Sequence, residues 1–136
     1  MKKLEKDQIE ALIDKAISMM DYSYVPYSHF HVGAALLAKN GNVYGGCNIE
    51  NASYPCGLCA ERAAAAQAIS AGNRAFAVLA VAGSGEEVCT PCGLCRQFLF
   101  EFAPNLRVLC ANRSGAFEEH TLQELLRAGF GGGSMS

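Results

Sequence analysis

Three cysteines and one glutamate of this 136-residue chain have the types and spacing of a hydrolytic metal centre. Cys59 and Glu61 lie two positions apart, and Cys92 and Cys95 follow later in the chain as a pair after Pro91. Three thiolates can hold a zinc ion and leave its fourth tetrahedral position open for water. A nearby carboxylate can take the proton of that water and deliver it elsewhere. A zinc ion that only supports a fold would not need the glutamate, so this set predicts catalysis.

A closed zinc site made of four cysteines is the alternative. The string Cys-Gly-Leu-Cys occurs at 56–59 and again at 92–95, and two such pairs can enclose a zinc ion completely. Three observations favour the open site. The second pair leads into a predicted helix that places both thiolates on one face, the acidic residue is present, and the domain is large enough to fold without a metal. We therefore interpret Cys56 as a bystander, with zinc ligation by Cys56 as the alternative.

Arg62 follows Cys59 by three residues, so a helix would place the two side chains on the same face. A zinc ion bound by three thiolates has a net negative charge, which weakens it as a Lewis acid. Hydrogen bonds from Arg62 to the ligand sulfurs would withdraw electron density from them. The positive N-terminal ends of helices predicted over 59–70 and 92–102 would also favour thiolates. The alternatives are a solvated surface arginine and, for Glu61, a surface carboxylate in a first helical turn.

Helices and strands alternate along the chain and must bring the two cysteine segments together. Apolar residues at helical spacing predict a first helix over 5–21. Strands over 30–39 and 42–49 flank Asn40-Gly41, a pair typical of a hairpin turn. The later elements predicted are an alanine-rich helix over 59–70, a strand buried on both faces over 75–82, a helix over 92–102, a strand over 106–111 and a short helix over 122–127.

This order of elements predicts one α/β domain over residues 1–130, followed by a flexible glycine-rich tail at 131–136. We expect the strands on either side of a crossover helix to run parallel. No stretch between the elements has the composition of a linker between domains.

The composition is that of a compact globular protein, with 51% apolar and 18% charged residues. The formal net charge of −2 and the lack of a basic run argue against binding to nucleic acid. The apolar runs are shorter than a bilayer span and no signal peptide is recognised, so we expect a cytoplasmic protein without membrane contacts. Seven cysteines then predict metal ligands and reduced thiols, with Cys47, Cys89 and Cys110 as small buried residues.

Four segments make the chain similar, over nearly its whole length, to the small homotetrameric cytidine deaminases. They are YVPYSHFHVGAA at 24–35, GCNIENA at 46–52, CAER at 59–62 and PCGLCRQ at 91–97. The zinc-binding motifs alone are typical of the wider cytidine and deoxycytidylate deaminase superfamily, whereas the first two segments favour free nucleosides. The resemblance implies a three-layer α/β/α fold with a mixed sheet of about five strands.

The resemblance also implies the reaction. It assigns one zinc ion per chain to Cys59, Cys92 and Cys95, and the role of proton shuttle to Glu61. The expected activity is hydrolytic deamination of cytidine and deoxycytidine to uridine and deoxyuridine, with release of ammonia. In that scheme hydroxide on the zinc attacks C4 of the cytosine, while Glu61 carries protons to N3 and to the departing amino group.

The nucleoside contacts are implied by the same resemblance. Asn48 and Glu50 would bond the ribose 3′-hydroxyl, Phe30 would pack on the pyrimidine, and the amide of Ala60 would meet the base carbonyl. The alternatives are turn roles for Asn48 and Glu50 and a core position for Phe30. In a homotetramer, neighbouring subunits would contribute further residues to each site, namely Ala52, Tyr54 and Phe130.

Two further observations concern the substrate and the shared site. A buried carboxylate at Glu50 would repel a 5′-phosphate, and few basic residues flank the motifs, so we expect a nucleoside rather than a nucleotide. Arg127 stands where the family often has proline, which affects how Phe130 is presented. The competing interpretations are deamination of another cytosine nucleoside, such as blasticidin S, and a non-catalytic zinc-ribbon module. The sequence does not rank cytidine against deoxycytidine.

Overall fold

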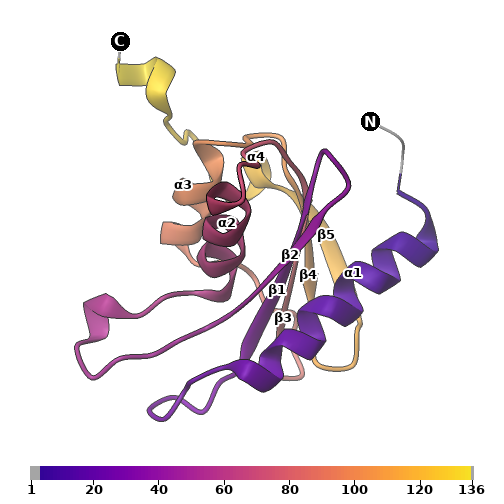
Figure 1. Ribbon diagram of the computed structural model, residues 1–136, viewed down its shortest axis with the longest axis vertical. Helices are drawn as coiled ribbons and strands as arrows, with labels where there is room; N and C mark the ends of the chain where they lie inside the picture. The colour runs from indigo at the N-terminus through magenta and orange to yellow at the C-terminus, as the bar shows by residue number, and fades with distance from the viewer. Residues whose placement is uncertain (1–3, 136) are drawn as a thin grey trace.

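The computed structural model describes residues 4–135, which form a mixed sheet with helices on both faces (Figure 1). Its strands are β1 (Val32–Ala38), β2 (Val43–Cys47), β3 (Phe76–Gly83), β4 (Arg107–Ala111) and β5 (Phe117–Thr121), in the order β2-β1-β3-β4-β5. Its α-helices are α1 (Lys6–Met19), α2 (Ala60–Ser70), α3 (Gly93–Phe100) and α4 (Leu122–Leu125). Short 3-10 turns are η1 (Met20–Tyr22), η2 (Tyr54–Cys56) and η3 (Gly132–Met135).

Helix α1 covers one face of the sheet, and α2, α3 and α4 lie on the other, which confirms the three-layer α/β/α fold (Figure 1). The alternation of side chains along β1 separates the two cores. Ala34 and Leu36 pack with α2, whereas Ala35 packs with α1. All residues of β3 are buried because this strand lies under helices on both faces, as its apolar sequence predicts.

The sheet confirms most of the predicted strands and corrects two points. Strands β3 and β4 are parallel neighbours on either side of α3, as expected. The strands on either side of α2 are not neighbours, because β1 lies between β2 and β3 and is antiparallel to both. Strand β5 was not predicted from the sequence, because its residues FEEHT are mostly exposed and polar.

The Asn40-Gly41 turn forms the predicted hairpin between β1 and β2. Gly41 has a φ of +95°, a conformation that glycine adopts without steric cost. The side-chain oxygen of Asn40 accepts a hydrogen bond from the Asn42 amide at 3.0 Å and closes the turn. The hairpin sets the register in which Gly46 of β2 lies opposite Ala34 of β1.

Helix α2 lies so close to β2 that Gly46 has no room for a side chain. A Cβ added there would lie 2.4 Å from the Ala60 carbonyl oxygen and 2.5 Å from the Ala64 amide nitrogen. We predict that Gly46→Ala lowers the free energy of unfolding by about 2–3 kcal/mol, because backbone must move to accept the methyl group. Urea denaturation measures the change. In the control Gly131→Ala the added Cβ meets no atom within 4 Å, and equal losses in the two variants would contradict the prediction.

The domain and tail assignments stay predictions. Residues 132–135 form the turn η3, and the last residue of the expected tail lies outside the described residues. Within residues 4–135, no helix is long and apolar enough to cross a bilayer.

Candidate active site

The starts of α2 and α3 bring three cysteines together. Cys59 is the N-cap residue of α2, Cys92 is that of α3, and Cys95 lies in the first turn of α3. The sulfurs of Cys59 and Cys92 are 3.7 Å apart, those of Cys92 and Cys95 are 3.6 Å apart, and all three lie within 4.8 Å of one another. Sulfurs bound tetrahedrally at about 2.3 Å from a zinc ion are separated by about 3.8 Å. The donor set and its spacing therefore fit zinc with one position left over.

Cys56 does not belong to this group. It lies exposed in η2, before α2 begins, and the cluster that can hold a metal contains only the three other cysteines among the residues from 4 to 135. This placement favours the open site over the closed four-cysteine site.

A neighbouring thiol and an arginine make the position of Cys59 suitable for a thiolate. Hydrogen bonding from Cys95 is the main cause that lowers the pKa of Cys59 to about 5, and it raises the pKa of Cys95 in turn. The guanidinium of Arg62 adds to the effect, since its Nη2 donates to the Cys59 sulfur at 3.7 Å. Arg62 thus has the contact that its spacing predicted. Its Nε is buried and has no hydrogen-bond partner among the described residues.

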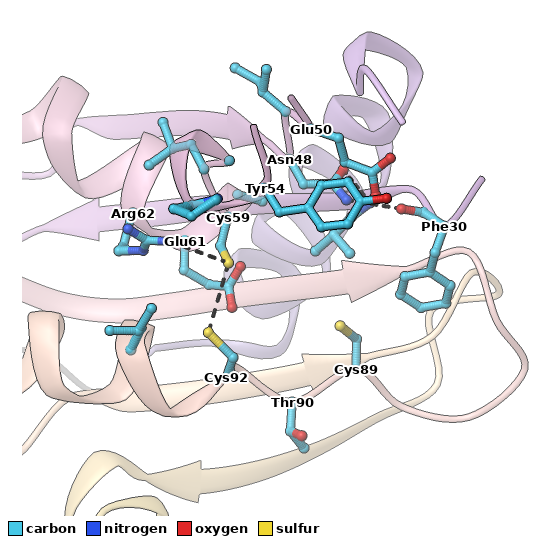
Figure 2. Close-up of a pocket in the computed structure, with 17 residues that line it drawn as sticks. Phe30, Asn48, Glu50, Tyr54, Cys59, Glu61, Arg62, Cys89, Thr90 and Cys92 are labelled. Atoms are coloured by element: carbon cyan, nitrogen blue, oxygen red, sulfur yellow. Dashed lines mark hydrogen bonds between the residues drawn. The ribbon is translucent and has the colours of Figure 1, made fainter. Parts of the chain in front are cut away.

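Glu61 is a buried carboxylate beside the sulfurs. Its side chain extends from the first turn of α2 into the cavity next to Cys59 and Cys92 (Figure 2). Only 4% of the residue is exposed, and this burial is the main cause that raises its pKa to about 7, with the charge of Cys59 adding to the effect. A carboxyl group whose pKa lies near neutral pH can both take up and release a proton there.

A cavity of about 500 Å³ opens in front of Glu61 and the thiols. This volume lies within the range that holds small organic ligands. Most of the predicted site residues line this cavity. They come from the loop before β1, from the loop between β2 and α2, and from the starts of α2 and α3: Phe30, Asn48, Glu50, Tyr54, Cys59, Ala60, Glu61, Arg62 and Cys92. Cys95 lies behind this lining and is fully buried.

The resemblance assigned three residues to the site of a neighbouring subunit, and they differ in whether they line the cavity of their own chain. Ala52 lies on an exposed loop and Phe130 near the C-terminus, and neither lines the cavity of its own chain. Tyr54, which the resemblance placed in a neighbouring site, lines the cavity of its own chain while 77% of the residue is exposed.

Asn48 holds the segment that carries Phe30. Its Nδ2 donates to the Phe30 carbonyl oxygen at 2.9 Å, and its Oδ1 accepts from the Val32 amide at 2.9 Å. An amide group of this kind has two donors and two acceptor sites, so each side-chain atom keeps one further bonding position. The structural role of Asn48 is therefore compatible with a further bond to a ligand.

Glu50 lies at the rim of the cavity rather than in its interior. Its Oε1 accepts hydrogen bonds from the amides of Tyr27 at 3.0 Å and Ser28 at 3.1 Å. Hydrogen bonding from Ser28 is the main cause that lowers the pKa of Glu50, so the group is ionised at neutral pH. The expectation that Glu50 is buried was wrong: the residue is half-buried, because its loop extends beyond the sheet.

Cys89 and Thr90 also line the cavity and were not predicted as site residues. They directly precede Pro91 and Cys92 in the sequence, which is the one signal that places them near the metal ligands. Cys89 was expected in the core but is half-buried, with its sulfur near Phe30 and Glu61 in Figure 2. Burial raises the pKa of Cys89 to about 12, so it remains a thiol at neutral pH.

Comparison with known proteins gives one consistent family. Residues 6–111 match the model of the cytidine and deoxycytidylate deaminase zinc-binding region. A cytidine deaminase of Sporosarcina psychrophila is 46% identical over 123 residues, which are 90% of each chain. The cytidine deaminase of Halalkalibacterium halodurans is 45% identical over 122 residues, 89% of this chain and 92% of the relative.

The fold agrees with a solved structure of the same kind. The crystal structure of a cytidine deaminase from Burkholderia pseudomallei superposes with a TM-score of 0.86 at 41% sequence identity, covering 93% of this chain and 100% of that one.

Proposed function

Because the chain belongs to the cytidine and deoxycytidylate deaminase family, we propose that it hydrolyses cytidine and deoxycytidine to uridine, deoxyuridine and ammonia. The observation that carries this proposal is the buried Glu61 carboxylate beside three thiols at the base of a cavity. Cys59, Cys92 and Cys95 are the proposed zinc ligands.

The reaction requires one water molecule and two proton transfers. Zinc, when bound, supplies the Lewis acid that makes water nucleophilic at neutral pH. Glu61 takes a proton from the water and gives it to N3 of the cytosine ring as the water oxygen bonds to C4. Glu61 then carries the second proton to the amino group, the C4–N bond breaks, and ammonia leaves. A pKa of about 7 suits both steps, since neither protonation state of Glu61 is strongly favoured.

The remaining cavity residues orient the nucleoside. Phe30 offers a ring face for the pyrimidine, and the Ala60 amide at the start of α2 can donate to the base carbonyl. Asn48 and Glu50 lie on the loop after β2, where they can bond the ribose 3′-hydroxyl. The ionised Glu50 would repel a 5′-phosphate, which supports a nucleoside substrate.

The test is the ultraviolet absorbance of protein with known zinc content, mixed separately with cytidine, deoxycytidine and deoxycytidylate. The cytosine chromophore should be lost with both nucleosides, and much more slowly with the nucleotide. Turnover of deoxycytidylate at the rate of cytidine would contradict the assignment to nucleosides. A zinc-loaded protein that converts none of the three would contradict cytidine deamination itself.

We further propose that the enzyme is a homotetramer in which Ala52, Phe130 and the exposed side of Tyr54, which also lines the cavity of its own chain, contribute to neighbouring sites. Tyr54 and Phe130 support this because 77% and 57% of these residues are exposed in the single chain. Sedimentation velocity at micromolar protein, combined with an activity assay, tests the assembly. A fully active monomer would contradict it.

The seven free cysteines support a reducing, cytoplasmic location.

Arg62→Gln is predicted to lower kcat for cytidine by about 10–100-fold, because the Cys59 sulfur loses a cationic hydrogen-bond donor. Zinc content, measured by atomic absorption, should fall less than activity, since all three proposed ligands remain. Arg113→Gln is the matched control, because Arg113 pairs with Glu86 at the surface and neither residue lines the cavity. Unchanged turnover and zinc content in Arg62→Gln would refute a role for Arg62 at the metal.

A further inference from the structure

Helix α3 holds two other segments of the chain besides carrying two of the proposed ligands. Arg96 donates from Nε to the Pro91 carbonyl oxygen at 2.7 Å and from Nη1 to the Leu125 carbonyl oxygen at 2.6 Å. Gln97, the next residue, donates from Nε2 to the Phe130 carbonyl oxygen at 2.7 Å. Pro91 immediately precedes Cys92, so one arginine contacts both the ligand loop and the segment at 125–130.

The segment at 125–130 is held on one side by a backbone hydrogen bond from the Leu126 amide to the Leu122 carbonyl oxygen at 2.9 Å. Helix α4 ends at Leu125, the first residue of the segment, and Ala128 has a φ of +54°, a conformation that is unfavourable for alanine. A Cβ added at Gly129 would lie 2.7 Å from Cδ2 of Leu126 and 3.2 Å from the ring of Phe100, so the backbone passes close to α3 there. The side chain of Phe130 contributes little burial, since 57% of the residue is exposed. The hydrogen bonds from Arg96 and Gln97 therefore hold the two ends of this segment, at Leu125 and Phe130, against α3.

We propose that Arg96 and Gln97 are positioning residues that join the zinc-ligand loop and the segment carrying Phe130 to one helix. This inference rests on the proposed function, because that function gives the zinc ligands and Phe130 their roles. The guanidinium is planar and can donate in two directions at once, which lets Arg96 bridge two backbone carbonyls. A charged donor bonded to a buried or half-buried carbonyl is also stronger than a neutral one.

The two residues should have separable effects. Arg96 fixes the carbonyl of the peptide that leads into Cys92, so its loss should disturb both the metal ligands and the C-terminal segment. The side chain of Gln97 bonds the C-terminal segment and not the ligand loop, so its loss should leave the metal ligands in place. With cytidine as substrate, Gln97→Met should raise KM through Phe130 with little change in kcat, whereas Arg96→Met should lower kcat as well.

Two measurements that do not depend on activity test the inference. Methionine keeps the length of either side chain without a donor, so Arg96→Met and Gln97→Met are compared with the wild type. The first measurement is the rate at which zinc passes from the protein to a chromogenic chelator. The second is the rate of trypsin cleavage after Arg127, an exposed residue inside the segment. Cleavage after Arg113, in the exposed turn between β4 and β5, is the internal control for the general susceptibility of the variant to trypsin.

Arg107→Met is the matched control variant. Arg107 donates two hydrogen bonds to Glu119 at 2.8 and 3.0 Å on the β4–β5 edge of the sheet, so this variant also loses two bonds from one arginine. It should change neither zinc release nor the ratio of cleavage after Arg127 to cleavage after Arg113.

We expect zinc release to be about 10-fold faster in Arg96→Met and unchanged in Gln97→Met. Cleavage after Arg127, relative to Arg113, should rise about fivefold in Gln97→Met and at least as much in Arg96→Met. If Arg96→Met does not fold, Arg96→Lys should give intermediate values, because its single nitrogen cannot occupy the positions of both Nε and Nη1 of Arg96. Zinc release from the Arg96 variant equal to that from Arg107→Met, or no relative gain of cleavage in Gln97→Met, would overturn the inference. A wild type inactive on cytidine would instead refute the proposed function, while both measurements still apply.

Discussion

Replacing Glu61 by glutamine is expected to lower kcat for cytidine by roughly 10³–10⁴-fold while the protein keeps its zinc. Glutamine has nearly the same shape but cannot accept the proton of the water or deliver it to N3 and the amino group. The fold should survive, because a neutral amide is easier to bury than a carboxylate at a position that is 4% exposed. Absorbance assays measure turnover, zinc analysis measures metal content, and the thermal midpoint of unfolding measures stability.

Glu118→Gln is the control for the Glu61 variant, since Glu118 is an exposed carboxylate on β5. It should retain wild-type turnover. Near-normal turnover of Glu61→Gln would refute the role of proton shuttle. Loss of zinc together with activity in Glu61→Gln would mean that the carboxylate supports the metal and that its effect on the reaction is indirect.

Cys95→Ser is expected to abolish activity and to weaken zinc binding by more than about 100-fold. The loss should exceed the 10–100-fold cost of removing an outer partner of a ligand, because a direct donor disappears. Cys95 is fully buried within the first turn of α3, and a serine hydroxyl there remains protonated at neutral pH and is a poor replacement for a thiolate. Competition with a chelator of known affinity measures the change.

Cys56→Ser separates the three-cysteine site from the closed alternative. Because Cys56 is exposed and lies outside the cluster, this variant should keep one zinc ion per chain and normal turnover. Loss of zinc in both Cys56→Ser and Cys95→Ser would instead identify four ligands and leave no position for water.

Strong local signals predicted the fold well where they existed. The apolar periodicity of α1, the alanine-rich α2 and the continuous apolar run of β3 each indicate their element in isolation. Strand β5 gave no such signal, because an edge strand with one exposed face needs little apolar sequence. The insertion of β1 between β2 and β3 depends on long-range pairing, which no single segment encodes.

In the candidate site too, contacts between residues close in the sequence could be predicted, whereas features that depend on the whole fold could not. The spacing of Cys59 and Arg62 was sufficient to predict their contact, because both lie at the start of one helix. The exposure of Glu50 could not be predicted, since it depends on how far a loop extends past the sheet. The bond from Arg96 to Leu125 joins residues 29 positions apart, so the motif gave no indication of this partner.

Strand β5 limits the ways in which copies of this chain can meet. Glu118 and Glu119 lie exposed along the free edge, and the ring nitrogens of His120 lie 3.5 Å from the Glu118 carboxylate and 3.7 Å from that of Glu124. A strand from another molecule could add to this edge only by bringing its backbone against these charges and removing their water. The polar sequence that hid β5 from prediction thus protects the sheet from aggregation at this end and directs any assembly towards other surfaces.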